Sequence, residues 1–443
     1  MRTELKKLHL TLLCGLICSL SFCQVKLPKA PKISTFKVLN SNLGLPKINI
    51  PNHNFPTSQT NGINVYKQDR RRVLQQENEL KQIYAELKAD RINYNLPSYG
   101  NIESTKHYRK IFDELAELNA DNFSLKKATF IIENAYYEEK QNYAEFEKVV
   151  KQTGNFLREK MDELGYDQNR NLAKNFILFK FFSDTLQIKS KDLKHLPFKY
   201  DFEDYLGIKD WSKMFVSKLL ATGKGQCNSL PRLYLILAEE IGAEAFLSLS
   251  PNHSYIKFKD EEENWYNVEL TNGMFTTESM ILQSGFIKSE ALQSGIYMQQ
   301  MTKKQLLSQL YSDFAQGYAR KFGYDPFVKK VIDKALELYP NSISANQMNS
   351  NYLTIQFEYV AKQVNINPRD RNDLQNIRNY PNIVKLLNNV NSQYNKVDDL
   401  GFEFMSAKAY QNWLASLKKT KQKQDSEDMK KQFNIKLKET FKN

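Results

Sequence analysis

The sequence predicts an α+β protein in which a cysteine-bearing helix packs on a small antiparallel sheet, with mostly helical regions on both sides. Of the 443 residues only 16 are glycine and 13 are proline, a composition that favours helices over a β-sandwich. Apolar residues recur at helical spacing along most of the chain, whereas residues 245–271 alternate as strands do. Hydrophobic residues make up 41% of the chain, enough to build a sizeable core.

The first residues, 1–23, have the pattern of a secretory signal peptide. A basic start, MRTELKK, leads into the apolar run Leu8–Phe22, which is shorter than the roughly 20 residues that a membrane-spanning helix needs. Small residues at Ser21 and Cys23, followed by Gln24, fit a signal-peptidase cleavage site. We therefore expect an exported protein, periplasmic or extracellular.

Two alternatives stay open for this segment. It could form a buried N-terminal helix, or Cys23 could be acylated in a lipoprotein, because Leu20 lies three residues before it. The bulk of Phe22 disfavours acylation. Residues 24–66 are rich in Pro, Asn and Lys without any periodicity, which predicts a flexible tether for association with a membrane or wall.

The net charge and the positions of the cysteines limit the classes of partner and of functional residue. The net charge is +13, but the cations are scattered and no zinc finger, RNP-type motif or basic zipper is present, so we expect anionic envelope surfaces and no nucleic acid as partners. Three of the four cysteines, Cys14, Cys18 and Cys23, lie in the signal segment. Cleavage would leave Cys227 as a lone thiol, which cannot form an intramolecular disulfide and is a candidate for function.

The regions on either side of residues 201–300 are predicted to be helical. In the N-terminal region, residues 67–200, the helical segments are Lys67–Lys88, His107–Leu118 and a stretch from Ser124, as N-cap, to about Thr185. In the C-terminal region, residues 301–417 with a start at Ser289, they are Ser289–Arg320, Phe327–Tyr339, Ile383–Val390 and Ala407–Leu417. Residues 418–443 are mostly charged and predict a solvated helix or tail.

The string ALELYPNSISA, which ends the helix Phe327–Tyr339, resembles the junction of two tetratricopeptide units. At most one or two such units are present, whereas a solenoid usually needs three. We therefore expect partly tetratricopeptide-like helical hairpins that pack against the core, with a protein partner from the envelope as a possible ligand.

The position of Cys227 follows from Pro231. Proline is tolerated only in the first turn of a helix, and the apolar stripe that follows it ends at Gly242, a natural C-terminal stop. The helix must then begin just after Cys227, with Asn228 or Ser229 as cap. The positive end of a helix dipole favours a thiolate there, and its free N–H groups can stabilise an oxyanion.

Strands follow this helix. A strand from Ala245 leads through a turn to HSYIKF from His253, and the acidic turn DEEEN leads to WYNVELT. Two antiparallel strands would bring His253 and Glu269 side by side. If Glu269 accepts a hydrogen bond from one imidazole nitrogen, the other can take the proton of Cys227.

This stretch resembles the transglutaminase-like superfamily of papain-like cysteine enzymes. The shared features are Gly225-Gln226-Cys227 at a helix start, His253 followed by an aromatic, and a carboxylate in the strand after Trp265. The resemblance covers roughly 60 to 100 residues and implies Cys227 as nucleophile, His253 as base and Glu269 as the group that orients the base. Here Glu stands where the family usually has Asp, and Tyr255 where it usually has Trp.

The same resemblance suggests that Trp211 could donate its indole N–H to an oxyanion. The expected function is hydrolysis of an amide or peptide bond, in a peptide or protein substrate, through a thioester. The alternative is a non-catalytic envelope scaffold or protein-binding module. A zinc site built from Cys227, His253 and Glu269 lacks the usual second cysteine or paired histidines, so no metal or cofactor is expected.

Overall fold

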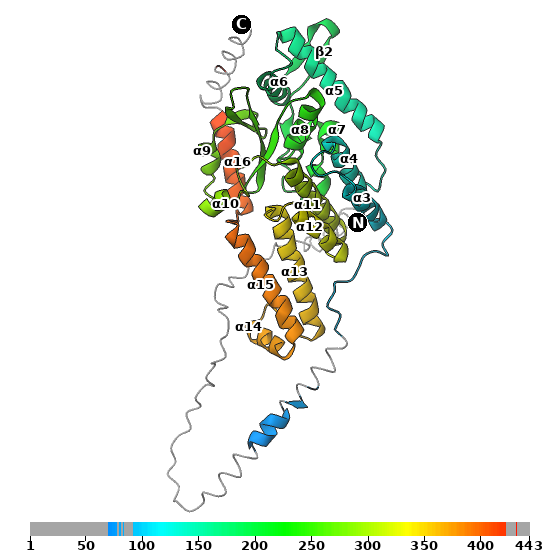
Figure 1. Cartoon of the computed structure of the whole chain (residues 1–443), viewed down its shortest axis with the longest axis vertical. Coiled ribbons are helices and arrows are strands. Elements are labelled where there is room, and N and C mark those ends of the chain that lie inside the picture. The colour runs from blue at the N-terminus through cyan, green and yellow to red at the C-terminus, as the bar shows by residue number, and fades with distance from the viewer. Residues whose placement is uncertain (1–69, 78, 81–82, 84–91, 422–430, 432–443) are drawn as a thin grey trace, which may run out of the picture. The chain divides into compact units, whose positions relative to one another are not determined.

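The computed structural model describes residues 70–77, 79–80, 83, 92–421 and 431 (Figure 1). The predicted signal segment, the tether and most of the charged tail lie outside the described residues. The chain divides into two compact units, Met1–Gln76 and Glu77–Asn443. Of the predicted helix Lys67–Lys88, residues 70–77, 79–80 and 83 are described and are helical.

The second unit confirms a mixed helix-and-sheet architecture, with small sheets among many helices (Figure 1). Its helices are α3 (Thr105–Ala116), α4 (Leu125–Tyr136), α5 (Tyr143–Leu164), α6 (Asn171–Ser183), α7 (Val216–Thr222), α8 (Ser229–Ile241), α9 (Glu278–Leu282), α10 (Ser289–Gln293), α11 (Lys303–Phe322), α12 (Pro326–Leu338), α13 (Ile343–Gln363), α14 (Arg371–Leu374), α15 (Pro381–Asp399) and α16 (Ala407–Lys421). Its strands are β1 (Leu186–Ile188), β2 (Leu193–His195), β3 (Lys199–Tyr200), β4 (Lys224–Gly225), β5 (Phe246–Ser250), β6 (His253–Lys259), β7 (Trp265–Glu269) and β8 (Met274–Thr276).

The main sheet has the antiparallel order β5-β6-β7-β8 and is covered on both faces. One face carries Ile256, Val268 and Phe275, which belong to the same buried cluster as the apolar side of α8. Phe275 packs on Phe179 of α6, with ring centroids 4.4 Å apart. Helices α9, α10 and α16 lie on the opposite side of the sheet (Figure 1). Side chains that alternate along each strand therefore enter two different environments.

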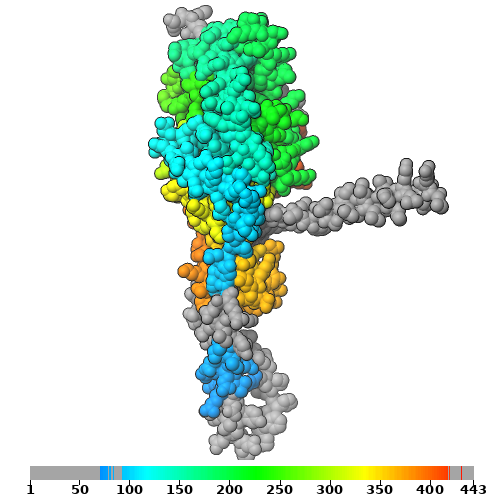
Figure 2. All heavy atoms as spheres, turned by 90° about the vertical axis from the view of Figure 1, so that its right-hand side faces the viewer, coloured from blue at the N-terminus to red at the C-terminus, as the bar shows by residue number. Residues whose placement is uncertain are grey.

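Long helices pack in pairs after the sheet, as predicted for helical hairpins. The Ser308 hydroxyl on α11 donates to the Ala335 carbonyl on α12 at 2.7 Å. On the next pair the Asn349 amide of α13 donates to the Gln393 side chain of α15 at 2.8 Å. The yellow and orange surface of α13 to α15 forms one end of this unit (Figure 2). No helix in the described part of the chain is long and apolar enough to cross a membrane.

The predicted helix Ser289–Arg320 is wrong in its first half. Helix α10 ends at Gln293, and α11 begins only at Lys303. Between them Gly295 and Met298 adopt left-handed φ angles of 74° and 64°, which break the helical path. The Met298 N–H instead donates to the Leu249 carbonyl at 2.9 Å, so this segment lies along the edge of β5. Apolar spacing alone did not distinguish this edge segment from a helix.

Candidate active site

Helix α8 begins two residues after Cys227, as the position of Pro231 requires. The predicted cap is only partly correct. Asn228 occupies the cap position without a side-chain capping bond, and its Oδ1 accepts a hydrogen bond from Arg232 at 3.1 Å instead. The Ser229 hydroxyl faces backwards and accepts from the Gln226 N–H at 2.9 Å. These bonds hold the loop that carries Cys227 against the start of α8.

Gly225 is required by close packing before the cysteine. A Cβ at this position would lie 2.9 Å from a methyl of Leu219 and from the Ser229 hydroxyl. The tight fit lets strand β4 pair in parallel with β3, where Tyr200 lies opposite Gly225. This pairing brings Tyr200 beside the cysteine loop, a contact that the sequence pattern did not indicate.

His253 and Glu269 form a direct pair, with 2.7 Å between Nε2 of the imidazole and the Glu269 Oε2. They are not strictly side by side, because Ile256 lies opposite Val268 and this register makes Glu269 a diagonal neighbour of His253. A glutamate is one methylene longer than an aspartate and spans this diagonal. The second Glu269 oxygen accepts from the Thr271 N–H at 2.8 Å, which fixes the carboxylate.

Both members of the pair are out of contact with solvent, with side chains 1% and 4% exposed. Burial by itself would lower the pKa of His253, but the charge of Glu269 and hydrogen bonds to Glu269 and Cys227 raise that pKa to about 10. Burial would raise the pKa of Glu269, and the His253 charge and hydrogen bond hold it below its usual value. The geometry therefore favours an imidazolium–carboxylate pair at neutral pH.

Cys227 lies near the imidazole, on a loop bound to the two neighbours of His253. Its side chain is half-buried, and a hydrogen bond with Cys227 is one of the interactions that raise the pKa of His253. The thiol also donates weakly to the Asn252 carbonyl at 3.9 Å, and the Ser254 hydroxyl donates to the Cys227 carbonyl. The structure thus joins His253 directly to Glu269, and it places Cys227 next to them through the residues on either side of His253.

Two aromatic residues of α16 complete the surroundings of His253, and neither was anticipated. The Tyr410 hydroxyl lies 3.1 Å from the imidazole Nδ1. The Trp413 ring meets the imidazole edge-on, with centroids 4.7 Å apart. Tyr410 is fully buried, and burial together with the nearby Cys227 raises the pKa of its phenol well above the usual value. Its hydroxyl also lies 3.5 Å from that of Tyr200.

Trp211 is placed elsewhere. It begins a short 3₁₀ helix and clusters with Met214 and Phe215. Its indole lies against α11, where a Cβ added to Gly317 would come within 3.3 Å of the indole nitrogen. The guanidinium of Arg320 lies 5.8 Å from the centre of the Trp211 ring. These contacts give Trp211 a packing role and provide no support for the predicted donation to an oxyanion.

The described residues contain no group of three or more His, Cys, Asp or Glu side chains that could hold a metal ion. Two hollows in the described part, one beside Trp211 and a larger one beside Lys257, are not lined by Cys227, His253 or Glu269. Comparison of the chain with family models, curated proteins and solved structures finds no match in any of the three. The function is therefore inferred from the chemistry of the site itself.

Proposed function

We propose that this protein is an exported thiol hydrolase with a transglutaminase-like core, which cleaves an amide or peptide bond. The observation that carries the proposal is the 2.7 Å contact between His253 and Glu269, beside a Cys227 loop that is bound to Asn252 and Ser254 on either side of the histidine. A nucleophile, a base and an oriented base partner are the parts that acyl transfer through a thioester needs. The thiol lies just before α8, so the partial positive charge of the helix N-terminus would stabilise a thiolate there.

The reaction would run in two steps. The Cys227 thiolate attacks the amide carbon, and the new C–S bond forms as the carbonyl electrons move to oxygen. His253 then gives its Nδ1 proton to the leaving nitrogen, so that the C–N bond breaks and an amine departs. In the second step water attacks the thioester, His253 takes the water proton, and the C–S bond breaks to release a carboxylic acid.

Glu269 stays ionised through both steps. It accepts a hydrogen bond from His253 Nε2, which leaves Nδ1 as the nitrogen that exchanges protons with the thiol and the substrate. The N–H groups at the start of α8 would stabilise the oxyanion. Peptide or protein amides are the proposed substrates, since the chemistry needs only a carbonyl and a leaving amine.

A second candidate is a scaffold or protein-binding module that keeps the triad fold without turnover. The nearly complete burial of His253 favours it, because a base must reach the leaving group of a substrate. The paired helices α11 to α13 and α15 would then supply the binding surface for an envelope protein partner.

Alkylation of Cys227 by iodoacetamide separates the two candidates. In the whole chain, mass spectrometry of the Cys227 peptide gives a rate constant at each pH. The enzyme proposal predicts that His253→Ala slows alkylation at pH 7 by about tenfold or more, because the thiolate loses its imidazolium partner. His195→Ala is the matched control, since His195 stacks on Phe181 outside the site. An equal rate in the wild type and His253→Ala would favour the scaffold.

A further inference from the structure

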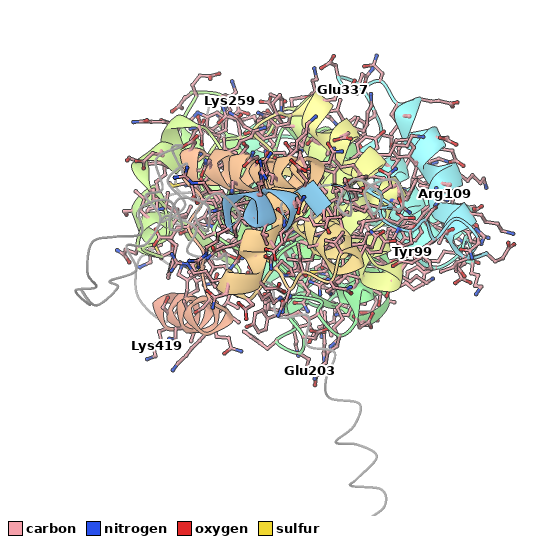
Figure 3. The ribbon with its side chains drawn as sticks, turned by 90° about the horizontal axis from the view of Figure 1, so that it is seen from below. Tyr99, Arg109, Glu203, Lys259, Glu337 and Lys419 are labelled. Atoms are coloured by element: carbon pink, nitrogen blue, oxygen red, sulfur yellow. The ribbon has the colours of Figure 1, made fainter. Side chains whose placement is uncertain are left out.

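Helix α16 contacts the candidate site through one apolar face. The buried residues Tyr410, Leu414 and Leu417 recur at helical spacing. Between them Trp413 contacts His253, while Lys408 and Asn412 are exposed on the opposite side of the helix. The helix lies at the periphery of the unit, where the labelled Lys419 projects outward (Figure 3). One side of α16 is thus free, and the other side covers His253.

Side chains of the core hold the main chain of α16 and of Met405, two residues before it. The Asn252 amide donates to the Met405 carbonyl at 2.9 Å, and the Asn272 amide donates to the Leu417 carbonyl at 2.8 Å. The Tyr205 hydroxyl donates to the Ala407 carbonyl at 3.3 Å. These are three ordinary hydrogen bonds, each contributing on the order of 1 kcal/mol. The buried Tyr410, Leu414 and Leu417 contribute the larger, apolar part of the attachment.

The chain between α15 and α16 suits a hinge. Gly401 has a φ of 85°, and a Cβ there would overlap the backbone of Ala291, so this end of the connection is fixed. The following residues, 402–406, form no helix or strand, and the Phe404 side chain is exposed. Met405 is buried, so it would move together with α16 about residues 402–404, and the sheet and α15 would stay in place.

We propose that α16 is an inhibitory lid, which must leave His253 before an amide substrate can reach Cys227. The lid would block the transfer of a proton from His253 to the substrate. The leaving nitrogen of a substrate must come within hydrogen-bond distance of Nδ1, and the Tyr410 hydroxyl occupies that position at 3.1 Å. Trp413 closes the edge of the same imidazole. A substrate and α16 therefore compete for one atom of the base.

That α16 inhibits an activity rests on the proposed function. The access of reagents to the thiol can be tested without any substrate. A cleavage sequence for a specific protease replaces residues 402–404 in the whole chain, which folds before it is cut. Cys227 is then alkylated with iodoacetamide and with a bulky maleimide dye. Cutting is expected to raise the maleimide rate at least tenfold and the iodoacetamide rate much less, because the lid excludes large reagents first.

A second pair of variants keeps the chain intact. Tyr410→Ala combined with Trp413→Ala removes the two rings that cover His253, and we expect faster maleimide labelling. The matched control, Lys408→Ala combined with Asn412→Ala, alters the exposed face of the same helix and should label as the wild type does. A cut placed in the loop 165–169, far from α16 in the sequence, controls for nicking.

The outcomes are distinct. Unchanged maleimide labelling after α16 has separated from the cut chain, or failure of α16 to separate together with wild-type labelling of the double variant, overturns the lid. Faster labelling supports it. If labelling rises but neither variant nor cut chain shows a His253-dependent rate, the lid stands and the hydrolase proposal fails. If maleimide labelling stays unchanged while His253→Ala slows alkylation, the hydrolase proposal stands and the lid fails.

Discussion

One face of the main sheet carries two acid–base pairs with different surroundings. His253 and Lys257 point to the same face of β6, because they are separated by an even number of residues. His253 pairs with Glu269 at 2.7 Å, and Lys257 pairs with Glu278 at 3.2 Å. The Glu269 side chain is 4% exposed, whereas that of Glu278 is 61% exposed.

The covering elements account for this difference. At the His253 end, α16 lies across the sheet and removes solvent from the pair. At the Lys257 end, the short helices α9 and α10 leave a hollow of about 390 Å³ that Trp265 and Leu282 help to line. The cover by α16 therefore shields both charges of the His253–Glu269 pair from water, whereas the Glu278 carboxylate of the other pair is screened by solvent.

Loss of the buried carboxylate is expected to have the largest effect. Glu269→Gln leaves His253 buried without its charge partner, and breaking a buried pair costs about 3–5 kcal/mol. Glu278→Gln, the matched change in the open pair, is expected to cost at most about 1 kcal/mol. Urea unfolding followed by circular dichroism and by fluorescence measures both free energies. Equal losses in the two variants would contradict the role given to burial.

The dependence of stability on pH is the next largest effect. The folded state holds the His253 proton up to a pKa of about 10. The stabilisation of the fold by this proton is therefore complete below the ordinary pKa of 6.5 and is lost as the pH rises toward 10. The lowered pKa of Glu269 adds a contribution that is present above 4.5 and lost on acidification. The difference in melting temperature between wild type and Glu269→Gln should therefore be greatest between about pH 4.5 and 6.5. A difference that grows from pH 7 to 10 would have the wrong sign.

The predictable part of the site is local in sequence. Pro231 and Gly242 bound α8, and the structure begins and ends that helix where they require. The acidic turn between β6 and β7 makes a hairpin, so a histidine and a glutamate on its two arms meet. Each of these inferences depends on residues close together along the chain, where backbone geometry leaves few choices.

The cover of the site depends on contacts distant in sequence. The segment Ala407–Leu417 was predicted as a short helix, but its apolar stripe does not reveal which surface it meets. Tyr410 reaches His253 from the C-terminal end of the described chain, and Tyr200 arrives through a two-residue parallel pairing. Trp211, by contrast, packs on α11 because aromatic residues have many equivalent partners in a large core.

Removal of a single hydroxyl from the lid should have a smaller effect. Tyr410→Phe keeps the ring and loses the hydrogen bond to His253 Nδ1, which is expected to cost about 0.5–1.5 kcal/mol. Hydrogen exchange in α16 should speed up, because the helix then opens more often. Tyr205→Phe is the control, since its hydroxyl contacts the Ala407 carbonyl and leaves the imidazole untouched. Faster exchange in Tyr205→Phe than in Tyr410→Phe would place the main attachment of α16 outside the site.

The smallest effect is expected at the open end of the sheet. Trp265→Ala removes a half-exposed ring that lies 5.7 Å from the Lys257 ammonium, so the loss of stability should be about 1 kcal/mol or less. Alkylation of Cys227 should not change, because a packed cluster that includes Tyr255 and Tyr297 lies between this hollow and His253. If Trp265→Ala altered that rate severalfold, the two ends of the sheet would be coupled, and the hollow would belong to the same site as the triad.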